Sequence, residues 1–268
     1  AQNGKQWLRL AQDADARAAS LKGSAVPLAY AASKESRLVD FRGYQYTRTP
    51  SEVSGALMTR YDETRPQIWK IPLRDRLQPS LSIDAPGAGY IVPAAHASWV
   101  GAKLKAHGID FRTLDARQGV AVQSFRASQA TPAAQSSEGH QRMTVKGEWK
   151  PDKRDIGAGA LFVPIAQPKS RLAMSILEPL APDSLVGWGE FNNAFERKEY
   201  MEDYVAEEVA REMLQDPAVK ARFEQRIRDD AAFAKDPQAR LEFFHRLHAS
   251  WDERYNLYPV MRVDRVPR

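Results

Sequence analysis

Acidic, amide and aromatic side chains are concentrated between residues 178 and 200. A carboxylate pair such as Glu196 and Glu199 could exchange protons with a substrate as general acid and general base. The same composition is more often that of a solvated helix face beside a buried aromatic, but the Trp-Gly and Asn-Asn turns could still shape a ligand pocket or a contact surface. The candidates for ligand contact are Trp188, Glu190, Asn192, Glu196, Glu199 and Tyr200.

Histidine offers one further possibility for chemistry. His245 and His248 are three residues apart in a predicted helix and could share a metal ion, with Glu242 and Asp252 nearby. The usual zinc signatures His-x-x-Glu and His-Glu-x-x-His are absent from the sequence. We therefore expect His248 on the apolar side of the helix and His245 at its edge, and the pair is only a weak metal candidate.

Two similar phrases, "GAGYIVPAA" from Gly87 and "GAGALFVPIA" from Gly157, raise the question of a phosphate-binding loop. Such a loop follows a strand and precedes a helix, so that free amides point at the anion. Here the Gly-x-Gly precedes the strand, and the strand is followed by a proline that has no amide hydrogen. The phrases instead predict a turn, a buried strand and a following helix, and together they suggest a duplicated β-α unit.

Composition restricts the class of protein. The chain has 268 residues, 43% of them hydrophobic and 27% charged, and it contains no cysteine, which excludes disulfides and thiolate metal sites. The net charge is +5, but no basic run or basic-aromatic cluster accompanies it, so we expect no nucleic-acid partner. No apolar run approaches the roughly 18 residues that a membrane span requires.

Hydrophobic periodicity predicts the elements that position these residues. A helix is expected over 5–22 and ends at Gly23; because it begins without a cap, we expect it to continue from an upstream segment. Alternating residues at 37–47 and the proline-bounded segments "PQIWKIPL" and "PSLSIDAP" predict strands, later segments predict a mixed sheet with β-α units, and the polar stretch 128–141 predicts a mobile loop. Two Asp-Pro pairs, at 216 and 236, each predict a helix start.

The predicted fold class is therefore α+β: a mixed β-sheet body with β-α units, followed by a helical C-terminal subdomain. The expected division is a linker helix at 1–23, a mixed domain at 24–190 and a helical subdomain at 191–268.

Several long phrases carry a family resemblance that runs over nearly the whole chain. They are "RGYQYTRTPSEVSGALMTRYD", "GYIVPAAHASWVGAKLKAHGIDF", "LFVPIAQPKSRLAMSILEPLAPDSLVGWGEFN", "KEYMEDYVAEEVAREML" and "SWDERYNLYPVMRV". Together they resemble the C-terminal region of bacterial zinc metallocarboxypeptidase-like proteins, a secreted or periplasmic branch of the carboxypeptidase A family.

The resemblance implies zinc, a general-base Glu and a carboxylate-binding Arg, but it implies them in a catalytic domain upstream of this region. This chain has no His-x-x-Glu onto which the zinc ligands could be carried, so no catalytic residue and no cofactor are assigned to it. The resemblance implies two partners for this chain: the upstream peptidase domain of the same protein and a peptide substrate.

Three hypotheses follow. The first is a non-catalytic accessory domain that shapes access of peptides to the peptidase and exposes an apolar patch for docking. The second is a stand-alone module that binds a peptide or cell-wall fragment, and the third is an independent carboxylate-based hydrolase. The second would use an aromatic-lined site formed by Trp188, Trp251, Tyr255 and Tyr258.

Overall fold

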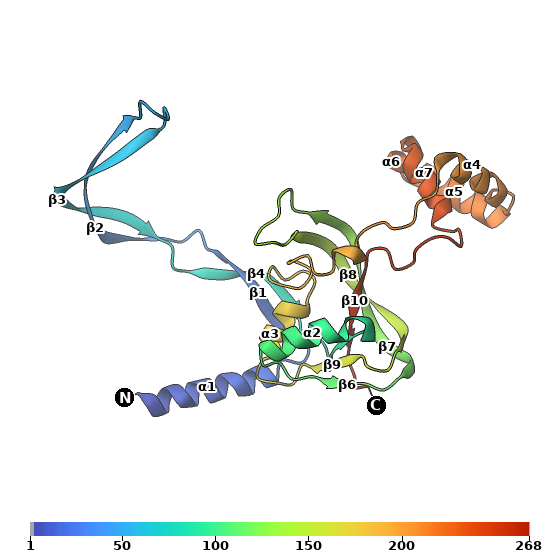
Figure 1. The fold of residues 1–268 in the computed structure, drawn as a ribbon, viewed down its shortest axis with the longest axis horizontal. Coiled ribbons are helices and arrows are strands. Elements are labelled where there is room, and N and C mark those ends of the chain that lie inside the picture. Colours follow the sequence, from blue (N-terminus) through green and yellow to red (C-terminus); the bar gives the residue numbers. More distant parts are fainter. Residues whose placement is uncertain (1–2, 268) are drawn as a thin grey trace. The chain divides into compact units, whose positions relative to one another are not determined.

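The computed structural model describes residues 3–267, which fold as an α+β protein with antiparallel sheets and most of its short helices toward the C-terminus (Figure 1). The chain divides into two compact units. Ser24–Asp84 form one unit, and the remaining described residues form the other. The larger unit is therefore made of two separate stretches of the chain, before and after the smaller unit.

The smaller unit is built from two antiparallel strand pairs. β1 (Ala25–Ala32) pairs with β4 (Leu77–Asp84), and β2 (Arg37–Pro50) pairs with β3 (Leu57–Leu73). The alternating sequence from residue 37 and the proline-bounded segments near 66 and 79 predicted strands at β2, β3 and β4, and this prediction is confirmed. The β2–β3 pair, which we call the ribbon, is a separate two-stranded sheet.

The larger unit contains a six-stranded antiparallel sheet in the order β6-β9-β5-β10-β7-β8. Its strands are β6 (Arg112–Thr113), β9 (Leu161–Pro164), β5 (Gly89–Val92), β10 (Leu257–Val263), β7 (Arg117–Pro132) and β8 (Met143–Ile156). β10, near the C-terminus, lies in the middle of the sheet between β5 and β7. Residues 191–268 are therefore not a purely helical subdomain, because the chain returns to the sheet after its last helix.

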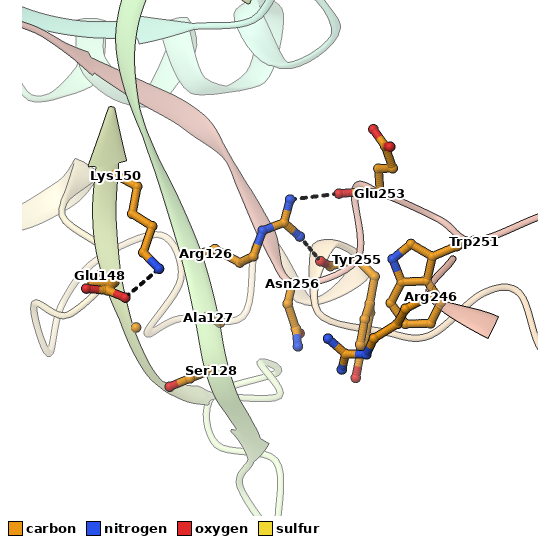
Figure 2. A pocket seen from close by; sticks show the side chains of 11 residues that line it. Arg126, Ala127, Ser128, Glu148, Lys150, Arg246, Trp251, Glu253, Tyr255 and Asn256 are labelled. Carbon is orange, nitrogen blue, oxygen red and sulfur yellow. Dashed lines mark hydrogen bonds and ion pairs between the residues drawn. The ribbon is translucent and has the colours of Figure 1, made fainter. Parts of the chain in front are cut away.

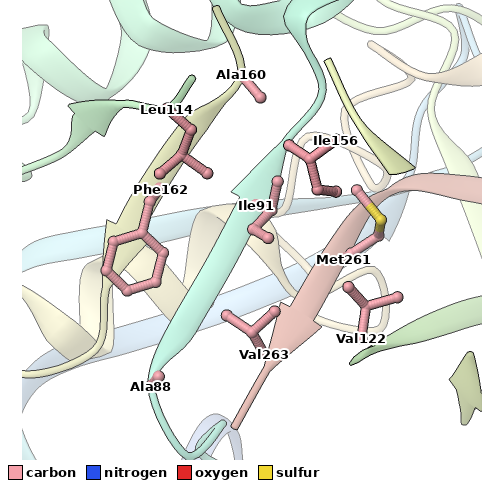
Figure 3. Close-up of a cluster of buried hydrophobic side chains, with 9 residues drawn as sticks. All are labelled: Ala88, Ile91, Leu114, Val122, Ile156, Ala160, Phe162, Met261 and Val263. Atoms are coloured by element: carbon pink, nitrogen blue, oxygen red, sulfur yellow. The ribbon is translucent and has the colours of Figure 1, made fainter. Parts of the chain in front are cut away.

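One cluster of apolar side chains fills the sheet's core (Figure 3). It contains Ala88, Ile91, Leu114, Val122, Ile156, Ala160, Phe162, Met261 and Val263, which are all buried. They come from strands far apart in the sequence, so the sheet order is fixed by side chains that meet only in the folded chain. The short apolar runs of β5 and β9 are buried at nearly every position, as strands of a covered sheet are.

The two glycine phrases form neighbouring strands and no phosphate loop. β5 and β9 pair antiparallel, with Tyr90 opposite Val163. Only glycine fits at position 89 of this strand pair, because a Cβ there would lie 2.1 Å from the Val163 carbonyl oxygen. The first phrase leads directly into α2 (Ala94–Ala106), whereas α3 (Ser170–Leu177) begins six residues after the second proline.

Two further elements differ from expectation. The helix predicted at 5–22 is α1 (Gly4–Ala19), but none of its residues is buried. The stretch 128–141, expected as a mobile loop, begins as strand: β7 continues to Pro132, and only the connection to β8 is a loop. Strand pairing satisfies the backbone of this polar segment without any apolar burial.

The helical part comprises η1 (Asn192–Ala194), α4 (Asp203–Met213), α5 (Pro217–Asp229), α6 (Ala231–Lys235) and α7 (Pro237–His245). Asp216 and Asp236 cap the helices predicted from the Asp-Pro pairs, and each accepts at least one backbone amide hydrogen. Asp230 caps α6 in the same way, but no proline follows it to mark the helix start in the sequence.

Aromatic rings form the core of this helical part. Phe223, Phe233 and Phe244 are buried together with Ala210. The sequence period predicts one apolar face for the segment containing α4, formed by Met201, Tyr204, Val205, Val209 and Met213. This is partly wrong, because Tyr204 is exposed and the buried residues of α4 are Ala206 and Ala210. Small alanines allow α4 to approach α7 closely, which a face of large side chains would prevent.

Candidate functional site

The predicted ligand-contact stretch is divided among several structural contacts. Trp188 is half-buried, with the Arg142 guanidinium 4.0 Å from its ring centre and His140 packed edge-on against it. Asn192 donates a hydrogen bond from Nδ2 to the Gln141 carbonyl oxygen at 2.8 Å. Both candidates therefore hold the β7–β8 loop, and neither lines the cavities described below.

The acidic candidates do not converge. Glu190 forms an ion pair with Lys103 of α2, with 2.9 Å between Nζ and Oε1. Glu196, Glu199 and Tyr200 are exposed, and Tyr200 retains 75% of its accessible surface. Glu196 and Glu199 line neither of the cavities described below, so they do not face an enclosed space in which a substrate could meet both.

The two weak metal candidates are not on one helix. α7 ends at His245, so His248 lies beyond it. The positions are also the reverse of the expectation, because His245 is the buried ring and His248 is partly exposed. His245 Nδ1 lies 2.9 Å from Nη2 of Arg197, and His248 Nδ1 lies 2.9 Å from Ser250 Oγ.

The contact with Arg197 fixes the protonation of His245. A guanidinium can only donate, so Nδ1 accepts and the ring proton of the neutral form is on Nε2. Burial, the Arg197 charge and His248 lower the pKa of His245 below its usual value. A ring in this state offers a metal no free lone pair, and no group of three or more potential metal ligands occurs within residues 3–267.

Two of the four aromatic candidates line one cavity together. Trp251 and Tyr255 border a cleft of about 1020 Å³ between the β7–β8 hairpin and residues 246–256 (Figure 2). Trp188 does not line this cleft, and Tyr258 is buried in the core, where its hydroxyl donates to the Leu177 carbonyl oxygen at 3.1 Å.

Two cations of the cleft are already paired. Arg126 donates to the backbone carbonyl oxygens of Glu253 and Tyr255, at 2.9 and 2.8 Å (Figure 2). Lys150 forms an ion pair with Glu148 at 2.8 Å. With both of these side chains already engaged and the aromatic rings half-buried, the cleft suits a polar ligand with an apolar face.

The group with the most unusual chemistry is a buried ion pair that was not singled out as a site in the sequence. Glu178, which directly follows α3, is completely buried and contacts side chains from three strands. Its Oε1 accepts from Tyr90 Oη at 2.5 Å and from Arg262 Nε at 2.8 Å. Its Oε2 lies 2.5 Å from Arg262 Nη2 and accepts from Trp149 Nε1 at 3.2 Å.

The buried charges and hydrogen-bonding groups of this cluster find their partners within it. The Arg262 guanidinium neutralises the carboxylate and lies 4.4 Å from the ring centre of Trp149. Burial, together with the Glu178 charge, raises the pKa of Tyr90 well above its usual value, so this hydroxyl remains a donor. Glu178 lines neither the cleft at Trp251 nor the cavity of about 460 Å³ at His96, and its contacts fix β5, β8 and β10 against the end of α3.

Large apolar side chains are exposed on α1 and on the ribbon, as well as singly on other elements. On α1, Trp7, Leu8 and Leu10 each retain more than half of their accessible surface. On the ribbon, Phe41 and Tyr61 are 49% and 59% exposed. With Tyr46 and the half-buried Trp69, these two rings form an aromatic cluster with centroid distances between 5.8 and 6.2 Å.

Gly43 makes this aromatic cluster possible. A Cβ at Gly43 would lie 2.4 Å from the indole of Trp69, so only glycine allows that ring to cross the strand. A two-stranded ribbon is marginally stable by itself in water, and exposed aromatic clusters of this kind mark interaction surfaces. The alternation of apolar residues in the sequence predicted the strands but contained no signal of their exposure.

Comparison of the chain with models of protein families, with curated proteins and with solved structures gives no match. None of the helices in residues 3–267 is both long and apolar enough to cross a lipid bilayer.

Proposed function

We propose that this chain is a non-catalytic accessory C-terminal domain of a secreted or periplasmic bacterial zinc carboxypeptidase-like protein. In this proposal the zinc and the peptidase chemistry belong to an upstream domain, which is the partner of this chain. The domain supports or shapes access of peptide substrates. The resemblance of the long phrases to the C-terminal region of such proteins suggests the family.

The observation that carries the proposal is the exposed apolar surface of α1 and of the ribbon. Trp7 and Phe41 leave 64% and 49% of their accessible surface in water, which is costly for rings of this size. Docking of another domain would cover such side chains and would stabilise a ribbon of only two strands. The exposed carboxylates of Glu196 and Glu199 also favour this function over an independent hydrolase.

Docking is tested with the natural segment encoded directly upstream, purified separately, and titrated against this chain by calorimetry. The proposal predicts saturable binding that the double variant Phe41→Ser with Tyr61→Ser weakens at least about tenfold. Val53→Ser is the matched control, because Val53 is 98% exposed at the ribbon turn and lies outside the aromatic cluster. Absence of binding, or equal binding by all three proteins, would overturn the docking role.

The cleft at Trp251 and Tyr255 supports a second function, a stand-alone module that binds a peptide or cell-wall fragment. Binding of short peptides or muropeptides to the isolated chain, lost in Tyr255→Ala and retained in the ribbon variant, would favour this function. Binding that depends on the ribbon instead would favour docking.

A further inference from the structure

A separate cavity of about 460 Å³ lies in the larger unit. Five segments line it: the start of α2 at Pro93–His96, Ser124 of β7, the end of β8 with the following Gly157, residues 193–198, and β10 up to Met261 with the preceding Arg254. Its volume falls within the range of small-molecule sites. None of the six ligand-contact candidates from the sequence lines it.

Positive charge is in excess at this cavity. Arg154, Lys198 and Arg254 line it, against the single carboxylate of Asp155. Arg154 pairs with Asp152 at 2.6 Å. The side chains of Lys198 and Arg254 have no acidic partner among the residues that the structure describes, and both are exposed.

Asp155 does not cancel this excess, because its single negative charge stands against both Lys198 and Arg254, and its Oδ1 is already engaged by the backbone amide of Gly119 at 2.7 Å. The two cations without an acidic partner, Lys198 and Arg254, are therefore free to meet an anion that enters the cavity.

The floor of the cavity is apolar. Ile156, Tyr258 and Met261 are buried residues that line it, and Leu257 and Pro259 of β10 complete this surface. A fully hydrated inorganic ion gains nothing from such a floor, whereas an anion attached to an apolar group would bury that group there.

His96 adds an uncharged polar group. Its ring packs edge-on against Phe191 and Trp99, with centroids 5.1 and 6.0 Å away. Partial burial lowers the pKa of His96, so its imidazole is neutral at pH 7 and carries one N–H donor. No hydrogen bond to its ring nitrogens occurs among the described residues.

We propose that this cavity binds a small organic oxyanion, a carboxylate or a phosphate, attached to an apolar group. Lys198 and Arg254 meet the anion, the His96 ring donates to an oxygen, and the apolar group lies against β10. This site is independent of domain docking, since it shares no residue with the ribbon or α1.

The test is an NMR titration of the full chain with four probes, following the His96 ring and the Ala95 amide. N-acetylphenylalanine and phenyl phosphate carry the two anions on an apolar group. N-acetylphenylalanine amide has the same shape without the charge, and inorganic phosphate has the charge without the apolar group. The proposal predicts saturable shifts for at least one of the first two probes and at least about tenfold weaker binding of the last two.

The double variant Lys198→Ala with Arg254→Ala should weaken the productive probe at least about tenfold. Lys5→Ala with Arg9→Ala is the matched control, because it removes the same charges from the exposed helix α1. Binding of only one of the two apolar anions identifies which oxyanion the site takes. The proposal would be overturned if neither apolar anion bound, if N-acetylphenylalanine amide bound as tightly as N-acetylphenylalanine, or if the control variant weakened binding as much as the double variant at Lys198 and Arg254.

Discussion

The six-stranded sheet and the ribbon use similar residues in opposite ways. Tyr90, Phe125 and Tyr258 of the sheet are completely or almost completely buried, whereas Phe41 and Tyr61 of the ribbon remain about half exposed. Alternating aromatic and β-branched residues therefore specify strands in both regions, but only a second layer turns such strands into a core. The difference supports the proposal that the sheet is complete within this chain and that another surface completes the ribbon.

The largest predicted effect is at the buried ion pair. Glu178→Ala should lower the free energy of unfolding by about 3–5 kcal/mol, because it leaves the Arg262 charge buried and unpaired. Chemical denaturation measures the loss. The matched control is Asp75→Asn in the smaller unit, which breaks an exposed pair with Arg37 and should leave the unfolding midpoint unchanged. Equal effects of the two variants would contradict the contrast between the regions.

A smaller loss is expected at Trp188. Its ring is half-buried beneath Arg142, so Trp188→Ala should cost about 2 kcal/mol, below the roughly 3–5 kcal/mol typical of a fully buried ring. Thermal or denaturant unfolding checks this value. A neutral result would mean that the ring faces solvent and would restore Trp188 as a ligand-contact residue.

Acid should destabilise the larger unit through His245. Its pKa is lowered in the folded chain, so the unfolded chain binds the proton more readily. The contribution to stability is therefore complete above the unfolded pKa of about 6.5 and is lost as the pH falls below it. His245→Gln should reduce this loss, while His107→Gln, an exposed control, should not.

The pH dependence is measured by unfolding between about pH 8 and pH 5, a window that brackets the titration of histidine. The ribbon contains no histidine, so hydrogen exchange of its amides should not follow the His245 transition. If His245→Gln lost as much unfolding free energy in acid as the unchanged chain does, His245 would not be the source of the acid destabilisation.

The smallest effect on stability is expected on the ribbon. Phe41→Ser with Tyr61→Ser should lower the free energy of unfolding of the isolated chain by about 1 kcal/mol per site or less, because about half of each ring is in water already. The effect should appear instead in binding to the upstream segment. A large loss of stability in the isolated chain would show that the aromatic cluster is a core in its own right.

The sequence predicted the elements better than it predicted their contacts. The α+β class, the strand at 37–47, the helix after Pro93 and the caps at Asp216 and Asp236 all follow from local periodicity and turn chemistry. Glu178 lies 88 residues from Tyr90 and 84 from Arg262, so no local pattern could pair them.

The candidate site was only partly predictable for the same reason. Trp251 and Tyr255 were identified as aromatics of one segment, but their cleft depends on the β7–β8 hairpin, whose Arg126 lies 127 residues before its partner Glu253. His245 and His248 were placed on one helix because the period continues through both, whereas α7 ends at His245. In the structure His245 is buried and His248 is partly exposed, which is the reverse of the expectation.

The central claim, that this chain carries no peptidase chemistry of its own, is tested most directly by elemental zinc analysis of the isolated chain. It is paired with an assay for release of C-terminal residues from a panel of short peptides. We predict no stoichiometric zinc and no release by this chain. Stoichiometric zinc with release of C-terminal residues would contradict the claim and would make the chain an enzyme in its own right.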